Sequence, residues 1–320
     1  MTRVLVTGAT GFIGRQLCEN LAAAGYLVRA ALRTDRALPA WIAEKTVTGD
    51  ICGATRWGAA LENVELVIHA AARTHVLYDS PANSRLYMET NTEGTQALVA
   101  EAARRSIRRF IYLSSVKVNG EGRGERPYTA ADEPQPLDAY GSSKWLAEQR
   151  LWETVARTSL QAAVVRAPLV YGAGVGANFL RLLRWIDHER ILPLGAVRNR
   201  RSLVSLWTLC DLLTRLLDHP AAVNGTWMVA DGEDISTPEL VRRLAHLMGR
   251  RARLLSAPPS LLRLAGALAG KGAEMRRLCA SLTVDIASTR ERLDWTPPLS
   301  MDAALAQTVG WYRSEGRTSR

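Results

Sequence analysis

Short apolar runs alternate with helical patterns over the first half of the chain. The runs are rich in β-branched residues, and several contain almost no polar position, as strands that are covered on both faces require. Between them, apolar residues recur at spacings of three and four, which is typical of amphipathic helices. The alternation predicts an α/β fold with a doubly wound parallel sheet. The predicted strands are residues 4–6, 26–32, 46–51, 66–72, 110–115 and 161–166.

The regular alternation ends near Gly172, where glycine and proline begin to interrupt short helical pieces. Two later apolar runs, 201–204 and 226–229, are expected to return to the edge of the sheet. The leucine-rich segment 258–272 is expected to be a packed helix, with a membrane-surface helix as the alternative. We therefore expect a Rossmann-type domain of residues 1–172 and 201–232, and a smaller, mixed C-terminal substrate domain of residues 173–200 and 233–320.

Three other segments have distinct signals. One helix is predicted over residues 86–105, and Gly94 inside it indicates close packing on the sheet, because glycine otherwise weakens a helix. The loop 120–136 is long for a compact domain, so it is expected to border the substrate. A later helix is predicted to begin at Ser236, whose hydroxyl is a typical cap.

A glycine-rich turn joins the first strand to the first helix. Gly8 permits the tight turn, Gly11 lets the backbone approach a pyrophosphate, and Gly14 lets the helix pack closely on the strand. The unpaired N–H groups at the start of a helix also favour a phosphate. The pattern therefore predicts a dinucleotide site at Gly8, Thr10, Gly11, Phe12, Ile13 and Gly14.

The end of the second strand indicates which dinucleotide binds. NAD-binding folds commonly have an acid here that holds the ribose hydroxyls. This chain has Leu32 and Arg33 instead, and an arginine suits a 2′-phosphate, so NADP is favoured over NAD. In the alternative interpretation Arg33 is solvated and Asp35 serves the ribose.

Two further strand ends are expected to contact the dinucleotide. Asp50 is placed to accept from the adenine amino group while Ile51 packs on the ring, although Asp50 could also be a plain loop carboxylate. After the fourth strand, the small side chains of Ala70, Ala71 and Ala72 would let the backbone run along the dinucleotide.

Tyr140 and Lys144 are four residues apart on a predicted helix, so they share a face. An ammonium beside a phenol, with help from a nicotinamide cation, favours the phenolate. Tyr140 would then exchange a proton with a hydroxyl or carbonyl group. Ser115 would hold the same oxygen, and Lys144 would also reach the cofactor ribose. The alternative is an ordinary helical Tyr and Lys, but their position after a hydroxyl-ended strand favours chemistry.

Composition narrows the class of protein. The net charge of +10 is compatible with nucleic acid, anionic lipid or a polyanionic substrate, but the arginines are spread out without interleaved aromatic residues. We therefore expect no nucleic-acid partner. No apolar run reaches about eighteen residues, and the first strand leaves no room for a signal peptide. The four cysteines lack metal-ligand spacing, so a cytoplasmic protein without membrane insertion or metal is expected.

Seven motifs, in this order, resemble the extended short-chain dehydrogenase/reductases of the NAD-dependent epimerase/dehydratase family, in the UDP-glucose 4-epimerase-like branch. They are TGATGFIG, GDI, HAAA, NTEGT, LSSVKVNG, YGSSK and LVYG, and the similarity covers nearly the whole chain. The resemblance implies that Ser115, Tyr140 and Lys144 are catalytic. It implies that Asn91 is a structural and proton-relay neighbour at the cofactor. It also implies a homodimer through the helices that carry Asn91 and Tyr140.

The same resemblance implies a UDP-sugar substrate, held at the sugar by Ser115, Lys117 and Tyr140. Lys117 and the preceding valine stand where the 4,6-dehydratases have an Asp-Glu pair, so water elimination is not expected. Asn178 is expected to meet the diphosphate, and Arg201 matches the arginine that relatives use to clamp it. Arg276 or Arg277 is the expected partner of that arginine.

The leading hypothesis is hydride transfer at C4 of a UDP-hexose or of its 4-keto derivative, for surface polysaccharide precursors. A 4-ketoreductase and a 4-epimerase share this machinery, and Arg33 favours the reductase slightly because NADPH is the usual reductant. An NADPH-dependent reductase of a small non-nucleotide carbonyl compound is the alternative. A non-catalytic binding module is the least favoured class, because all three catalytic residues are present.

Overall fold

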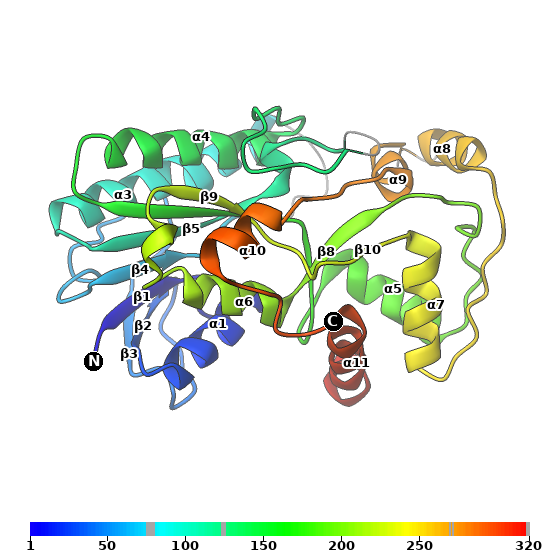
Figure 1. The fold of residues 1–320 in the computed structure, drawn as a ribbon, viewed down its shortest axis with the longest axis horizontal. Coiled ribbons are helices and arrows are strands. Elements are labelled where there is room, and N and C mark those ends of the chain that lie inside the picture. The colour runs from blue at the N-terminus through cyan, green and yellow to red at the C-terminus, as the bar shows by residue number, and fades with distance from the viewer. Residues whose placement is uncertain (75–80, 123–125, 269, 271, 318–320) are drawn as a thin grey trace.

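A computed structural model of the protein describes residues 1–74, 81–122, 126–268, 270 and 272–317. Its larger part is a sheet of seven parallel strands in the order β3-β2-β1-β4-β5-β6-β9 (Figure 1). The strand order reverses between β1 and β4, which is where such sheets bind dinucleotides. The strands are β1 (Arg3–Thr7), β2 (Leu27–Leu32), β3 (Glu44–Val47), β4 (Leu66–His69), β5 (Arg109–Ser115), β6 (Gln161–Ala167) and β9 (Gly225–Met228).

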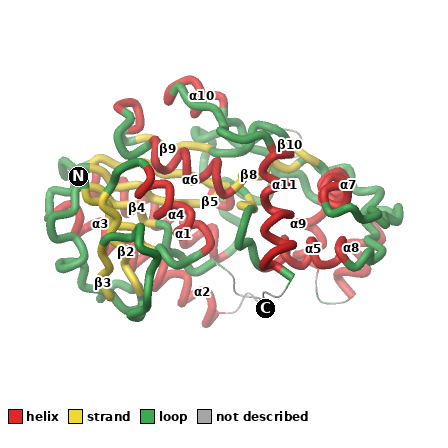
Figure 2. The backbone as a smooth tube through the Cα atoms, turned by 90° about the horizontal axis from the view of Figure 1, so that it is seen from below, coloured by secondary structure: helices red, strands yellow, loops and turns green. Residues whose placement is uncertain are grey.

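Helices cover both faces of this sheet, as its apolar strands require. On one face α1 (Phe12–Ala23) packs against α6 (Leu206–Arg215), and on the other α3 (Gly94–Arg104) packs against α4 (Ala139–Val155) (Figures 1 and 2). Side chains alternate between the two cores along each strand. On β1, for example, Val4 and Val6 are fully buried in the α1 and α6 core, and Leu5 in the α3 core.

A second, three-stranded sheet has the order β10-β8-β7. Its strands are β7 (Leu169–Tyr171), β8 (Arg201–Ser205) and β10 (Asp234–Ile235). The expectation that residues 201–204 return to the main sheet is therefore wrong, because β8 pairs with β7. The same expectation for residues 226–229 is confirmed, because β9 pairs parallel with β6. A short apolar run does not reveal which of two sheet edges it will join.

The smaller part of the molecule has its own apolar core. It contains α5 (Ala177–Asp187), α7 (Thr237–Leu247), α8 (Pro259–Leu268), α9 (Gly272–Cys279) and α11 (Met301–Trp311). The predicted cap of α7 is confirmed, because Ser236 Oγ accepts a hydrogen bond of 3.2 Å from the Glu239 backbone N–H. Leu183, Leu244 and Leu305, from three of these helices, are fully buried in this core.

The last part of the chain differs from the expected division. Helix α10 (Ala287–Leu293) lies against the main sheet rather than in the smaller core, and Leu293 is buried in the same cluster as β1. Thr289 Oγ1 donates to the Met228 carbonyl at 2.7 Å, and Trp295 Nε1 donates to Asp211 Oδ2 at 2.7 Å. These contacts attach residues 287–295 to β9 and α6.

The segment expected as one helix over 86–105 has three parts. They are α2 (Pro81–Tyr87), a π-helical turn over Met88–Glu93, and α3. Short helical turns also occur at Val116–Val118, Pro220–Ala222 and Tyr312–Gly316. In the predicted substrate loop 120–136, residues 123–125 lie outside the described part of the chain. Within the described part, every helix is too short or too polar to cross a bilayer.

Candidate active site

The glycine-rich turn between β1 and α1 has the geometry that the sequence predicts. Gly8 has a φ of +70°, which favours glycine, and a Cβ there would lie 2.9 Å from the Ala71 backbone N. A Cβ at Gly14 would lie 2.6 Å from the Gly8 carbonyl carbon, so only glycine allows this helix–strand contact. Gly11 caps α1 without a side-chain acceptor. These features fit a pyrophosphate at the N–H groups of Phe12 and Ile13.

Arg33 and Asp50 lie together at the neighbouring strand ends. The Arg33 Nη1 to Asp50 Oδ1 distance is 3.7 Å, and the two side chains are 76% and 86% exposed. Asp35, the alternative ribose ligand, is instead paired with Lys45 at 2.6 Å, and this partner lowers the pKa of its carboxyl group. Both groups therefore have a partner of opposite charge, and the pair of Arg33 with Asp50 is the looser of the two.

Ile51 and Cys52, at the start of the following loop, pack closely on the helical segment beside them. A Cβ at Gly94 would lie 3.2 Å from the Cys52 backbone N and would also meet the Ile51 side chain. The predicted close contact of Gly94 is therefore confirmed, but its partner is this loop and not the sheet. Ala70 and Ala72 flank Ala71 after β4 and are half-buried.

A hydrogen-bonded chain of buried side chains lies under the glycine turn. Thr7 Oγ1 is 2.7 Å from His69 Nδ1, His69 Nε2 is 2.9 Å from Thr95 Oγ1, and Thr95 donates to the Asn91 carbonyl at 2.6 Å. Because Thr95 already donates, it must accept from Nε2–H, so Nδ1 accepts from Thr7. Burial lowers the pKa of His69 to about 3, so the ring is neutral. His69 is a satisfied structural residue.

Asn91 lies in the π-helical turn, and its buried amide holds two segments together. Its Oδ1 accepts from the Arg73 N–H at 2.8 Å, and its Nδ2 donates to the Arg73 carbonyl and to Ser143 Oγ, each at 3.0 Å. Ser143 in turn donates to the Tyr140 carbonyl at 2.8 Å. Asn91 thus positions the start of α4 through Ser143. These bonds fit the structural part of its expected role.

The structure brings Tyr140 and Ser115 together. Asp138 caps α4 by accepting from the Gly141 N–H at 2.7 Å, which starts the helix just before Tyr140. Ser115 ends β5, and its hydroxyl accepts from the Lys117 N–H at 3.3 Å. Burial raises the pKa of Tyr140 well above that of a free phenol, and the neighbouring Ser115 side chain opposes this rise. This environment therefore favours the protonated phenol.

Lys144 is buried against β5. Its Nζ donates to the Leu113 carbonyl at 2.6 Å and lies 4.1 Å from the centroid of the Tyr112 ring. Burial lowers the pKa of Lys144 to about 7, and Glu148 opposes this shift. The ammonium is directed to the Leu113 carbonyl in β5, and its expected effect on the pKa of Tyr140 stays a prediction.

Sequence reasoning missed a buried ion pair on the same helix. Glu148 is fully buried and binds Arg166 of β6, with an Oε2 to Nη2 distance of 2.7 Å. Ser114 donates to Glu148, and Arg166 Nη1 donates to Asn119 Oδ1 at 3.2 Å. The pair therefore ties α4 to β5, to β6 and to the turn after Ser115. The pattern in the sequence that could have indicated Glu148 is the spacing of Tyr140, Lys144 and Glu148, which places all three along one helix face.

Lys117 belongs to a cluster of ion pairs at the start of α4. Its Nζ contacts Asp138 and lies 3.3 Å from Glu121 Oε1. Arg277 of α9 completes the cluster, with its Nε 2.7 Å from Glu121 and its Nη2 3.4 Å from Asp138. The cluster joins the loop after Ser115 to the smaller core. Both predicted substrate cations, Lys117 and Arg277, have acidic partners within the chain.

Arg201 and Asn178 do not lie in this cluster. Arg201 Nη1 donates to the Arg277 carbonyl at 2.7 Å and to the Ala280 carbonyl at 3.3 Å, so it holds the end of α9. Burial lowers the pKa of Arg201. Asn178 is exposed, and its Oδ1 accepts from Arg181 on the same helix at 2.9 Å. Arg201 therefore contacts Arg277, as expected, but through the Arg277 backbone carbonyl. The two guanidinium groups have different partners.

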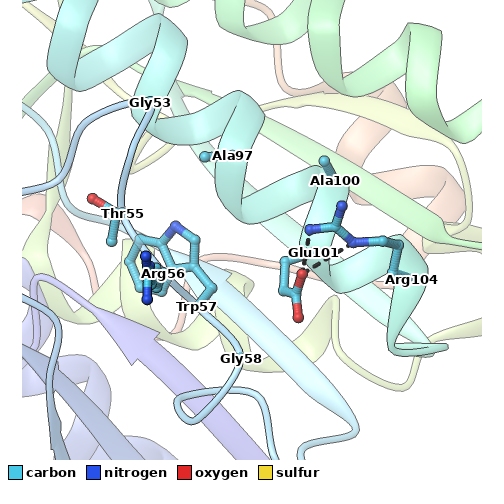
Figure 3. Close-up of a pocket in the computed structure, with 9 residues that line it drawn as sticks. All are labelled: Gly53, Thr55, Arg56, Trp57, Gly58, Ala97, Ala100, Glu101 and Arg104. Carbon is cyan, nitrogen blue, oxygen red and sulfur yellow. Dashed lines mark hydrogen bonds and ion pairs between the residues drawn. The ribbon is translucent and has the colours of Figure 1, made fainter.

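A pocket of about 380 Å³ lies apart from these residues, between α3 and the loop before β4. Figure 3 shows Glu101 and Arg104 paired beside it, with Trp57 on the loop side. It contains none of the predicted site residues. In the described ranges, no group of three His, Cys, Asp or Glu side chains is arranged to hold a metal ion.

Comparisons with known proteins show which proteins this chain resembles. A UDP-glucose 4-epimerase from Vibrio cholerae is 39% identical over 310 residues, which cover 96% of this chain and 94% of the relative. A ceramide reductase from Caulobacter vibrioides is 28% identical over 328 residues, with coverage of 98% and 95%. The solved structure of MoeE5 in complex with UDP-glucose and NAD has a TM-score of 0.77 and 25% identity, and covers 97% of this chain and 98% of that one.

The model of the NAD dependent epimerase/dehydratase family matches residues 4–230, which include the glycine turn and the predicted catalytic residues. Since the match spans most of the chain, and the Vibrio cholerae relative extends it to nearly the full length, the resemblance in the motifs is confirmed. This protein belongs to the NAD-dependent epimerase/dehydratase family.

Proposed function

We propose that this protein moves a hydride between a nicotinamide dinucleotide and C4 of a UDP-sugar, as a 4-ketoreductase or a 4-epimerase of surface polysaccharide precursors. One observation carries the proposal: the Ser115 side chain lies close enough to Tyr140 to lower its pKa, at the carboxyl end of β5, the edge where α/β sheets bind their ligands. The names of two similar proteins support the substrate class. One is a UDP-glucose 4-epimerase, and the other was solved with UDP-glucose and NAD.

The proposed chemistry assigns the proton to Tyr140. In reduction, its Oη–H gives a proton to the sugar oxygen at C4, and in oxidation the phenolate takes that proton back. Ser115 Oγ holds the same oxygen by a hydrogen bond. A dinucleotide bound at the N–H groups of Phe12 and Ile13 supplies or accepts the hydride. Burial raises the pKa of Tyr140 and so favours the protonated phenol, the form that reduction requires.

Two assays separate the possible outcomes. The purified protein is incubated with NADPH and UDP-4-keto-6-deoxy-GlcNAc, and in a second assay with oxidised dinucleotide and UDP-GlcNAc. Stoichiometric loss of NADPH absorbance in the first assay supports the 4-ketoreductase, which we favour slightly. A C4 epimer in the second, without a change in absorbance, supports the 4-epimerase. If both assays fail and a wider set of UDP-sugars is also unchanged, the proposed function is wrong.

A reductase of a non-nucleotide carbonyl compound is the second candidate. The similarity to a ceramide reductase supports it. The acidic partners of Lys117 and Arg277 also support it, because these cations are already neutralised within the chain. Inhibition by UDP distinguishes the two candidates: UDP should compete with a UDP-sugar substrate and should leave reduction of a simple ketone unaffected.

We infer that NADP is preferred, because Arg33 is exposed and lies at the end of β2. Arg33→Ala should weaken NADP binding by about tenfold, since a charge-assisted hydrogen bond to the 2′-phosphate is lost. NAD binding should change little. Titration of both dinucleotides by fluorescence measures this, with Arg150→Ala as the control on the surface of α4. Equal loss of both affinities would reject the NADP preference.

We also propose a cytoplasmic homodimer. The packing of α3 beside α4 on one face of the sheet supports a dimer in which these helices meet their counterparts in a bundle (Figure 1). Light scattering coupled to size-exclusion chromatography tests this proposal by the mass of the particle.

A further inference from the structure

Helix α8 is apolar on two of its sides. Leu262 and Gly266 are buried against the smaller core. Leu261, Leu264 and Leu268 follow each other at spacings of three and four on another side, and their exposed fractions are 56%, 58% and 83%. This spacing forms one stripe along the helix. The stripe lies uncovered in the part of the chain that the structure describes.

An apolar stripe of this kind marks an interaction surface. Single exposed leucines are ordinary, but aligned ones expose a continuous apolar surface to water. The segment that leads into α8 adds Leu255, which is 59% exposed. A helix that is apolar on both its inner and its outer side is typically covered on both. The charges around the stripe indicate the chemistry of the covering partner.

The chain around α8 is strongly basic. Residues 250–280 contain seven Arg and Lys residues and one Glu, a net charge of +6 out of +10 for the whole chain. Some of these arginines have acidic partners, such as Arg253 with Glu189. Arg251, Arg263 and Arg276 are exposed and form no ion pair with the described acidic side chains. Arg263 lies on α8 itself, between the first two leucines of the stripe.

Exposed leucines flanked by unpaired arginines are typical of helices that lie on anionic membranes, with the apolar side in the interface and the charges at the headgroups. We propose that α8 and its basic neighbours form a peripheral docking surface for an anionic lipid bilayer. Nucleic acid would use the charges but would leave the leucines exposed. A neutral protein groove would cover the leucines but would not use the charge.

The position of α8 is compatible with the rest of the molecule. It lies at the other end of the long axis from α3, so docking would use different helices from those of the proposed dimer (Figures 1 and 2). Helix α9 packs against α8 and carries Arg277, which reaches Asp138 at the start of α4. A bilayer bound at α8 would therefore lie near the side of the candidate active site that α9 borders. The inference goes beyond the proposed function and holds for any substrate.

Co-sedimentation with vesicles tests the proposal. The full-length protein is mixed with vesicles of equal parts phosphatidylglycerol and phosphatidylcholine, and with vesicles of phosphatidylcholine alone. We expect binding to the anionic vesicles, with a decrease at high salt because the charges are then screened. The triple variant Leu261→Ser, Leu264→Ser, Leu268→Ser should bind roughly a hundredfold more weakly. The pair Arg251→Glu and Arg263→Glu should abolish the preference for anionic lipid.

Trp41→Ser with Val47→Ser is the matched control, because these side chains are 49% and 54% exposed in the larger part of the molecule. This variant should bind vesicles like the natural chain. Circular dichroism and activity on a soluble substrate verify that each variant is folded. Unchanged vesicle binding by a folded triple variant would overturn the proposal, as would equal binding to neutral vesicles. A change in oligomeric state instead would assign the stripe to a second copy of this chain.

Discussion

Tyr140→Phe is expected to lower kcat by about three orders of magnitude, because it removes the group that exchanges the proton with the sugar oxygen. The ring would stay in the first turn of α4, where Asp138 caps the helix. The dinucleotide affinity should therefore change by less than about twofold. Steady-state kinetics with the substrate found in the two assays, together with cofactor titration, measures both quantities.

Tyr87→Phe provides the matched control. Its ring centroid lies 5.8 Å from that of Tyr140, so the variant removes a hydroxyl from the same neighbourhood. It should retain most of the natural rate. If Tyr140→Phe were as active as Tyr87→Phe, the acid–base role of Tyr140 would be wrong, whatever the substrate.

Glu148→Leu should lower the free energy of unfolding by about 3–5 kcal/mol, since it leaves the buried Arg166 guanidinium without its partner. Chemical denaturation measures the change. The double variant Glu148→Leu, Arg166→Leu should recover much of the loss, because no unpaired charge remains. Glu233→Leu is the surface control, because Glu233 is 45% exposed and its partner Arg243 keeps Glu239 and Asp302, and it should change stability by less than about 1 kcal/mol.

A loss below about 1 kcal/mol in Glu148→Leu would mean that the ion pair does not hold α4 on the sheet. In that case the position of Tyr140 and Lys144 would depend on other contacts. The closest of these are the bond from Lys144 to the Leu113 carbonyl and the bonds between Asn91 and Ser143.

The strands of the main sheet and the glycine turn were predictable because their determinants are local. An uninterrupted apolar run needs covering on both faces, and Gly14 is required by a helix that begins beside the strand. The edge that β8 joins and the packing of α10 were not predictable. Both depend on contacts between residues far apart in the chain, such as Thr289 with Met228.

In the candidate site, residue types were easier to predict than their partners. The spacing of Tyr140 and Lys144 indicates a shared helix face, and Ser115 indicates a strand end. The spacing does not show that Leu113 and Tyr112 bind the ammonium. Nor does it show that Arg277 pairs with Glu121, because that contact joins residues from two cores. The direction of a long cationic side chain is set by tertiary electrostatics, which a pattern of single residues does not encode.

Direct transfer of hydrogen to the sugar is the central claim, and an isotope label tests it. The protein is loaded with reduced dinucleotide that carries deuterium at both C4 positions of the nicotinamide ring, and a UDP-4-keto sugar is supplied for one turnover. The account predicts deuterium at C4 of the product sugar, detected by mass spectrometry and NMR, and its absence with Tyr140→Phe on the same time scale. A product with hydrogen from solvent at C4, or no reduction of any UDP-4-keto sugar, would contradict it.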